Sequence, residues 1–282
     1  MLLAAAAGPA ATAVAADGVR LADVARQTSG LTGADLANIC NEAAISAGRG
    51  ERDEILQADF DYALERVVAG LQQRRLITDK EKRVIAYHEA GHALVGRLMG
   101  DAMQLHKVTI VPRGQALGYT LNLPEEDRYL HSTDELRDWL KVILAGRAAE
   151  QVVFGRITNG AANDLERATG IARSMVFEWG MGASMPHQQV RADNYALSEE
   201  TKGMRDAEQR GITDAAYRDA LRLVEVHRMY LDRLAEALLA TETLERPEID
   251  ALLEGLEPES NSSLDIGVAA ALATAPPPPP AP

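Results

Sequence analysis

Apolar residues recur at helical spacing along most of the chain. In residues 18–75 the runs DGVRLADVARQTSG, LTGADLANICNEAAISAGRG and LQADFDYALERVVAGL each place apolar side chains three or four positions apart, which is typical of amphipathic helices. Thr32, with Asp35 three residues later, supplies an acidic variant of the capping box for the second run. Residues 18–75 are therefore expected to form a small helical bundle.

The next segment combines helices with a pair of short strands. Thr78 and Glu81 form a capping box that predicts a helix over residues 79–100. Ser132 and Glu135 form another, which starts the long helix STDELRDWLKVILAGRAAEQVVFG. Between these helices, HKVTIVP and LGYTLNLP look like strands separated by the turn-forming RGQA, so a β-hairpin is predicted.

Two further helical runs follow. NDLERATGIARSMVFEWGMG is expected to stop at Gly180 and Gly182, and DAAYRDALRLVEVHRMYLDRLAEALLATETL to be helical throughout. The predicted fold class is mainly α with a small β element. The predicted division of the chain is an alanine-rich, disordered start, a helical subdomain, a mixed domain and a disordered proline-rich tail: residues 1–17, 18–75, 76–257 and 258–282.

Composition removes several classes of function. The formal net charge of −13 argues against nucleic acid as a partner, because a phosphate-binding face needs clustered lysine and arginine. Cys40 is the single cysteine, which excludes an intramolecular disulfide and any zinc site built from several cysteines. The chain has no apolar run near the ~20 residues of a membrane-spanning helix and no basic leader typical of a signal peptide.

The run AYHEAGHALVG carries the candidate chemistry. His88 and His92 lie four residues apart on a predicted helix, and Glu89 directly follows the first histidine. Both imidazoles can therefore reach one ion, while the carboxylate can act on water beside it. A catalytic zinc ion also needs a third protein ligand. Spacing alone leaves five candidates for that ligand: His106, Glu135, Glu150, Asp164 and Glu166.

Several longer blocks resemble a known family. VIAYHEAGHALV, HKVTIVPRGQALGYTLNLPEEDRYL, AGRAAEQVVFG and NGAANDLERATGIARSMVFEWGMG occur in the order found in the peptidase domain of FtsH-type zinc metalloproteases. Upstream, LADVARQTSGLTGADLANICNEAA is similar to the lid subdomain of that family's AAA+ ATPase module. The resemblance thus identifies residues 18–75 as a lid and residues 76–257 as a zinc metallopeptidase domain.

The resemblance implies a role for individual residues. It makes His88, His92 and Asp164 the ligands of one Zn²⁺ and Glu89 the general base. The strand containing Gly118, Tyr119, Thr120 and Leu121 matches the edge strand against which such proteases lay an extended substrate. In the lid, Gly33 and Ala34 fall where the family contacts adenine.

The resemblance also implies partners and a location. The expected substrates are unfolded or threaded proteins, and the expected assembly is a homo- or hetero-hexamer with FtsH-type subunits. ATP would be a cofactor only where another chain or an upstream region supplies an AAA+ core, because the motif G-x-x-x-x-G-K-[ST] does not occur in this sequence. The expected location is the cytoplasm, or the cytoplasmic face of a membrane through partner subunits.

Two alternatives to an autonomous endopeptidase follow from the missing ATPase motifs. The chain could be a non-autonomous assembly subunit, or a truncated fragment of an FtsH-type protease without its motor. Glu150-Gln151 also departs from the two consecutive glutamates common in the family. His187 lies in a divergent loop, where it is interpreted as a solvated residue.

Overall fold

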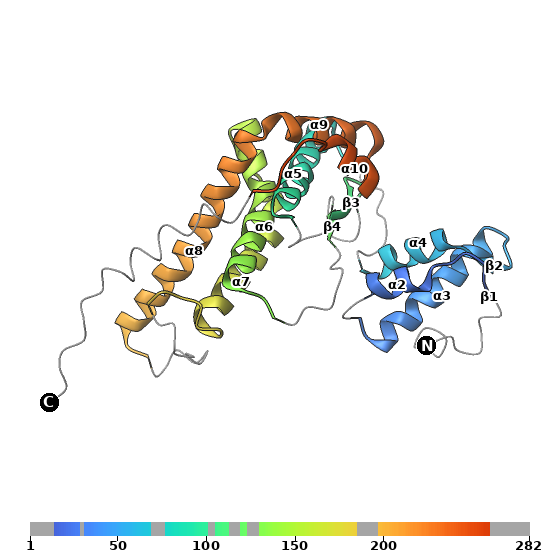
Figure 1. Cartoon of the computed structure of the whole chain (residues 1–282), viewed down its shortest axis with the longest axis horizontal. Coiled ribbons are helices and arrows are strands. Elements are labelled where there is room, and N and C mark those ends of the chain that lie inside the picture. The colour runs from blue at the N-terminus through green and yellow to red at the C-terminus, as the bar shows by residue number, and fades with distance from the viewer. Residues whose placement is uncertain are drawn as a thin grey trace.

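The computed structural model describes residues 14–28, 31–68, 77–100, 105–112, 119–122, 130–184 and 197–259. These residues form long helices and two small sheets, which confirms the predicted fold class (Figure 1). The α-helices are α2 (Leu21–Gln27), α3 (Gly33–Arg49), α4 (Gln57–Val68), α5 (Asp79–Leu98), α6 (Thr133–Phe154), α7 (Ala162–Phe177), α8 (Glu199–Val226), α9 (Arg228–Thr241) and α10 (Arg246–Leu252). The strands and the 3₁₀ helix are β1 (Val14–Ala15), β2 (Glu54–Ile55), β3 (Leu105–Thr109), β4 (Tyr119–Asn122), β5 (Thr243–Glu245) and η2 (Asn159–Ala161).

Helices α2, α3 and α4 pack around an apolar cluster of their own. Val24 of α2, Ile39 and Ala43 of α3, and Phe60 and Leu64 of α4 are buried together in it. The predicted capping box starts α3, because the Thr32 hydroxyl accepts from the backbone N–H of Asp35 at 3.3 Å.

Asp59 connects three parts of this small bundle. Its carboxylate accepts from both terminal nitrogens of Arg52, at 2.6 and 2.7 Å, and from the Ser46 hydroxyl at 2.7 Å. The backbone N–H of Leu56 donates to it at 2.9 Å. The Arg52 guanidinium is the largest cause of a pKa for Asp59 that falls from 3.8 to about 2.

One short strand lies inside the start that was expected to be disordered. β1 pairs in parallel with β2, and the backbone N–H of Ala16 donates to the carbonyl of Ile55 at 2.9 Å. Backbone pairing with a distant strand thus orders these few residues, although alanine has little strand preference. Residues 1–13, like the predicted tail beyond residue 259, lie outside the described part of the chain.

The larger helical unit is built around α5. This helix packs against α6 and α9, and α6 packs in turn against α7 and α8. α5 and α6 approach closely at Gly91, where a Cβ atom would stand 2.6 Å from the carbonyl oxygen of Ala145. Residues on nearly every side of α5 are buried, so its histidines lie inside the protein rather than on a solvent face.

The second sheet contains one strand more than the predicted hairpin. β3 lies between β4 and β5 and is antiparallel to both. β5 falls in the stretch that was expected to be helical throughout, so that prediction was wrong there. Glu242 adopts a left-handed conformation with φ 62° and ends α9, and Thr243–Glu245 then pair with β3. Among the described residues, β4 is an edge strand.

The helical boundaries near the carboxyl end also differ from the prediction. α8 begins at Glu199, fifteen residues before the predicted run, with Ser198 as its N-cap. The helix then breaks at His227, and α9 turns across α5 (Figure 1). The break allows the leucines of α9 to enter the same core as α5. α7 ends at Phe177, before the predicted stop at Gly180.

Lys107 of β3 joins the two helical units. Its ammonium group forms ion pairs with Glu65 of α4 and, at 3.0 Å, with Glu245 of β5. Among the described helices, none is both long and apolar enough to cross a membrane.

Candidate metal centre

The capping sequence of α5 fixes where this helix begins, and with it the positions of the two histidines. The Thr78 hydroxyl accepts from the backbone N–H of Glu81 at 3.3 Å, while the Glu81 carboxylate accepts from the backbone N–H of Thr78 at 2.9 Å. The predicted capping box is therefore present. His88 and His92 follow one turn apart, and their ring centroids are 4.8 Å from each other.

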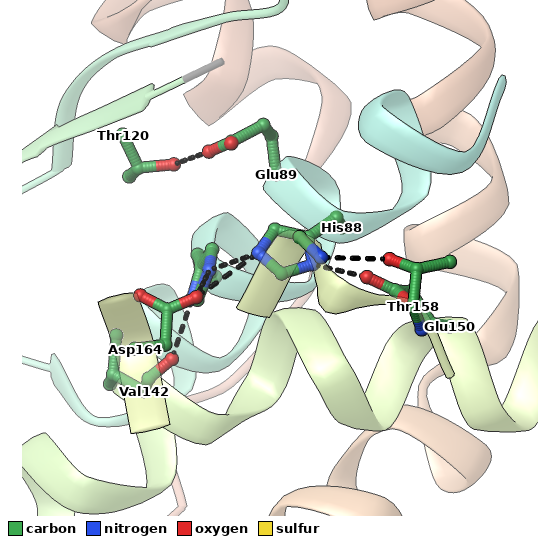
Figure 2. A network of polar contacts seen from close by, with 9 residues as sticks. His88, Glu89, Thr120, Val142, Glu150, Thr158 and Asp164 are labelled. Atoms are coloured by element: carbon green, nitrogen blue, oxygen red, sulfur yellow. Dashed lines mark hydrogen bonds and ion pairs between the residues drawn. The ribbon is translucent and has the colours of Figure 1, made fainter. Parts of the chain in front are cut away.

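The Nδ1 atom of each imidazole has an acceptor. His88 Nδ1 lies 2.8 Å from Glu150 Oε1, and His92 Nδ1 lies 2.8 Å from the carbonyl oxygen of Val142 (Figure 2). A carbonyl oxygen can only accept, so His92 carries its proton on Nδ1. The Glu150 carboxylate favours the same tautomer for His88. These contacts leave the Nε2 lone pairs available for an ion.

Both Nε2 atoms face the same carboxylate. Asp164 Oδ2 lies 3.1 Å from His88 Nε2 and 3.4 Å from His92 Nε2, and the two nitrogens are 3.1 Å apart. The three residues are the group of the described chain whose ligand atoms could hold one metal ion. Among the candidates whose side chains are described, Asp164 is thus the one that faces the Nε2 atoms of both histidines, whereas Glu150 contacts Nδ1 of His88.

This donor set fits zinc. Ligands bound tetrahedrally at about 2.0–2.1 Å lie about 3.3 Å from one another, close to the three separations observed. A positive charge stabilises the close approach of these atoms, and either a bound cation or a proton on an imidazole supplies it. Burial alone would lower the pKa of His88, but the carboxylates of Asp164 and Glu150 raise it to about 10. The histidines in turn lower the pKa of Asp164, despite its burial.

Glu150 contacts both His88 and the segment that leads to Asp164. Its side chain is 1% exposed. One carboxylate oxygen contacts His88, and the other accepts from the backbone N–H of Thr158 at 2.7 Å. Thr158 caps η2, and η2 leads directly into the first turn of α7, where Asp164 lies. Glu150 therefore positions one histidine and the segment that carries Asp164, a role that the sequence did not reveal.

Gly146 of α6 is a second residue that the sequence did not single out. A Cβ atom at this position would stand 2.5 Å from His92 Nε2 and 2.6 Å from His88 Nε2. These distances lie far below ordinary van der Waals contact, which begins at 3.4 Å. Glycine is required here because the imidazole nitrogens pass directly over the helix backbone. Gly146 is visible in the run AGRAAE, but its importance depends on how α6 crosses α5 in the folded protein.

Glu89 lies beside the centre and is 6% exposed. The Thr120 hydroxyl of β4 donates to its Oε2 at 2.9 Å. Figure 2 shows this pair apart from the contacts of His88 with Asp164 and Glu150. Burial raises the pKa of Glu89, although the neighbouring His92 and His88 oppose the rise. A buried carboxylate next to a metal site is suited to accept and return a proton.

The other candidates are placed differently. Glu135 caps α6, where its carboxylate accepts from the backbone N–H of Ser132 at 2.7 Å. Glu166 is exposed on α7. Gly33 and Ala34 are exposed in the first turn of α3. Gly118 and His187 lie outside the described residues, and so do the side chains of His106, Tyr119 and Leu121.

Together these features define a class of protein. Two imidazoles and a carboxylate converge from α5 and α7, a buried glutamate lies next to them, and an edge strand passes that glutamate. This arrangement is typical of hydrolytic metal sites in which a carboxylate acts on water.

The chain belongs to peptidase family M41. The model of that family, "Peptidase family M41", matches residues 75–252, and the "AAA+ lid domain" model matches residues 18–62. The resemblance drawn from the sequence is therefore confirmed at the level of this peptidase family and of the lid domain.

The chain is also similar to individual named proteins. The chain is 45% identical over 256 residues to the ATP-dependent zinc metalloprotease FtsH 3 of Symbiobacterium thermophilum, with 85% of this chain and 41% of the relative covered. It is 46% identical over 254 residues to the ATP-dependent zinc metalloprotease FtsH of Thermotoga maritima, with 84% and 41% covered. The chain thus spans about two-fifths of the length of these relatives.

Proposed function

We propose that the chain is a zinc-dependent endopeptidase that cleaves unfolded or threaded proteins. The observation that carries this proposal is the convergence of His88 Nε2, His92 Nε2 and Asp164 Oδ2. In this proposal these atoms hold one Zn²⁺, and Glu89 is the general base. The metalloprotease names of the relatives support the choice of metal and reaction.

The residues divide the work of peptide hydrolysis between them. When bound, zinc supplies a Lewis acid for the scissile carbonyl and makes water a nucleophile near neutral pH. Glu89 takes a proton from the attacking water and delivers it to the departing amine nitrogen. Glu150 and the carbonyl of Val142 keep the imidazoles in the tautomer and orientation that bind metal.

The substrate is proposed to lie along β4. An edge strand offers unpaired backbone groups to an extended peptide, which therefore binds through main-chain hydrogen bonds. Gly118, Tyr119, Thr120 and Leu121 are the positions proposed to contact it. Recognition through the peptide backbone would make the choice of cleavage position tolerant of sequence.

The remaining chain is proposed to couple this site to a larger assembly. Residues 18–75 act as an AAA+ lid and residues 76–257 as the peptidase domain, in a homo- or hetero-hexamer with FtsH-type subunits. Gly33 and Ala34 face nucleotide where an AAA+ core is supplied, and that core makes cleavage dependent on ATP. The proposed location is the cytoplasm or the cytoplasmic face of a membrane.

Zinc content and casein cleavage test the proposal. The wild-type chain is expected to bind one zinc ion and to cleave casein, which is largely unfolded. Glu89→Gln should retain zinc and lose cleavage, because the amide cannot take up the proton. Glu166→Gln is the matched control, since it removes an exposed carboxylate from α7. Full activity in Glu89→Gln would refute the role of Glu89, and a folded wild type without zinc would refute the metal site.

A further inference from the structure

Thr120 provides a direct connection between the edge strand and the buried glutamate. Its hydroxyl lies 2.9 Å from Glu89 Oε2, within the range of a good O–H···O hydrogen bond. The two residues are 31 positions apart in the chain, on β4 and α5. The contact therefore depends on how the sheet lies against α5, and not on local chain geometry.

The hydroxyl restricts the carboxylate in a way that suits a base. A carboxylate has two oxygens that can each accept a proton. A donor fixed on Oε2 engages that oxygen and leaves Oε1 to act on water. Threonine is β-branched, so its χ1 is stiff in a strand and its hydroxyl is held in place by the backbone.

The position of Thr120 on the strand links this restraint to substrate. Thr120 pairs with Val108 of β3 on one side of β4, and the described sheet leaves the other side open. A peptide that pairs with this open side would add a strand and stiffen β4. The Thr120 hydroxyl connects β4 directly to Glu89.

We propose that Thr120 is a positioning residue that ties the general base Glu89 to the substrate-binding strand, so that a peptide paired with β4 orients the carboxylate for reaction. This inference rests on the proposed function, because it assumes that Glu89 acts on water and that the peptide lies along β4. Thr120 itself transfers no proton. It acts on the reaction through the orientation of Glu89.

Steady-state kinetics on the full zinc-loaded chain separate this role from a structural one. Thr120→Val keeps the shape of the side chain but removes the donor. For a long extended peptide, kcat should fall about 10- to 100-fold, the scale of a small misplacement of a catalytic group, while KM stays near the wild-type value. Thr120→Ser restores the hydroxyl and should recover most of kcat. A blocked dipeptide, too short to pair with β4, should show little difference between Thr120→Val and wild type.

Thr109→Val is the matched control. Thr109 lies on β3 of the same sheet, and its hydroxyl donates to the carbonyl of Glu242 at 3.1 Å, away from Glu89. This variant should lower thermal stability without lowering kcat below its melting temperature. If Thr120→Val and Thr109→Val change KM and stability alike and leave kcat unchanged, Thr120 is a sheet residue and the inference is wrong.

A readout without catalysis completes the test. Thermal unfolding of the zinc-free chain is compared for wild type, Thr120→Val, Glu89→Ala and the double variant. The shift caused by Thr120→Val should be clearly smaller in the Glu89→Ala background, because the hydrogen bond is already absent there. Additive shifts overturn the inference. A wild type that cleaves no substrate refutes the proposed function, and the inference with it, whereas an active wild type with an equally active Thr120→Val refutes the inference alone.

Discussion

Gly146→Ala adds a single methyl group directly beneath the proposed zinc ligands. The new Cβ atom would stand 2.5 Å from His92 Nε2 and 2.6 Å from His88 Nε2, whereas ordinary contact begins at 3.4 Å. Relief of the clash therefore requires a relative shift of about 0.9 Å between α6 and the imidazoles, which is the difference between 3.4 and 2.5 Å.

A shift of this size is large for a metal site. Functional zinc–ligand distances vary by only about 0.2 Å, so both nitrogens cannot remain in bonding range of an ion that Asp164 also holds. We expect the zinc affinity to fall by about 10- to 100-fold or more. A loss of about 10- to 100-fold is typical when the groups that orient metal ligands are disturbed. The overpacked α5–α6 contact should also cost about 1–3 kcal/mol of folding free energy.

Isothermal titration with zinc and urea unfolding of the zinc-free chain measure the two effects. Gly170→Ala on α7 is the matched control, because a Cβ atom there has no neighbour within 4 Å. That variant should stabilise the chain by up to about 1 kcal/mol through helix propensity and leave zinc affinity unchanged. If Gly146→Ala binds zinc as tightly as Gly170→Ala does, the imidazoles do not lie over the α6 backbone and the reasoning is wrong.

Three other predictions follow from contacts in the described structure. Glu150→Gln should weaken zinc binding about 10- to 100-fold in a titration, because Glu150 contacts His88. Gln151→Ala should leave zinc binding unchanged, because Gln151 contacts Tyr217 and not a histidine. Equal zinc affinities of the two variants would contradict this prediction. Gly91→Ala should lower the free energy of unfolding by about 1–3 kcal/mol with or without zinc, and unchanged urea unfolding would refute the close α5–α6 approach. The pKa of Asp59 falls from 3.8 in the unfolded chain to about 2 in the folded chain. Its contacts with Arg52, Leu56 and Ser46 should therefore together contribute about 2 kcal/mol above pH ~4 and lose this contribution as the pH falls through ~2. Asp59→Asn should abolish that pH dependence in urea unfolding, and an unaltered dependence would count against the ion pair.

The parts of the fold that the sequence predicts well are those set by local interactions. The capping boxes at Thr78 and Ser132 start α5 and α6 where the pattern places them, because each box involves residues only three positions apart. β5 was missed because its hydrogen bonds go to β3, more than 130 residues earlier in the chain. A short run that directly follows a helix is predicted as part of that helix when its partner strand lies so far away in the sequence.

The same distinction applies to the candidate site. His88, Glu89 and His92 share one helix, so spacing alone brings them together. Asp164 could be chosen among five candidates only through the family resemblance, since it depends on the packing of α7 against α6. Gly146 was missed altogether, because its importance exists only once two helices cross. The ligand and base assignments stay predictions, which the experiments above address.

Direct observation of the bound metal ion tests the central claim. Crystals of the zinc-loaded chain, measured on both sides of the zinc absorption edge, give an anomalous peak at each zinc ion. We predict one peak per chain, bonded to His88 Nε2, His92 Nε2 and an oxygen of Asp164 at about 2.0–2.2 Å. A peak elsewhere in the molecule, or one bonded to the histidines with Asp164 out of range and another carboxylate in its place, would contradict the account.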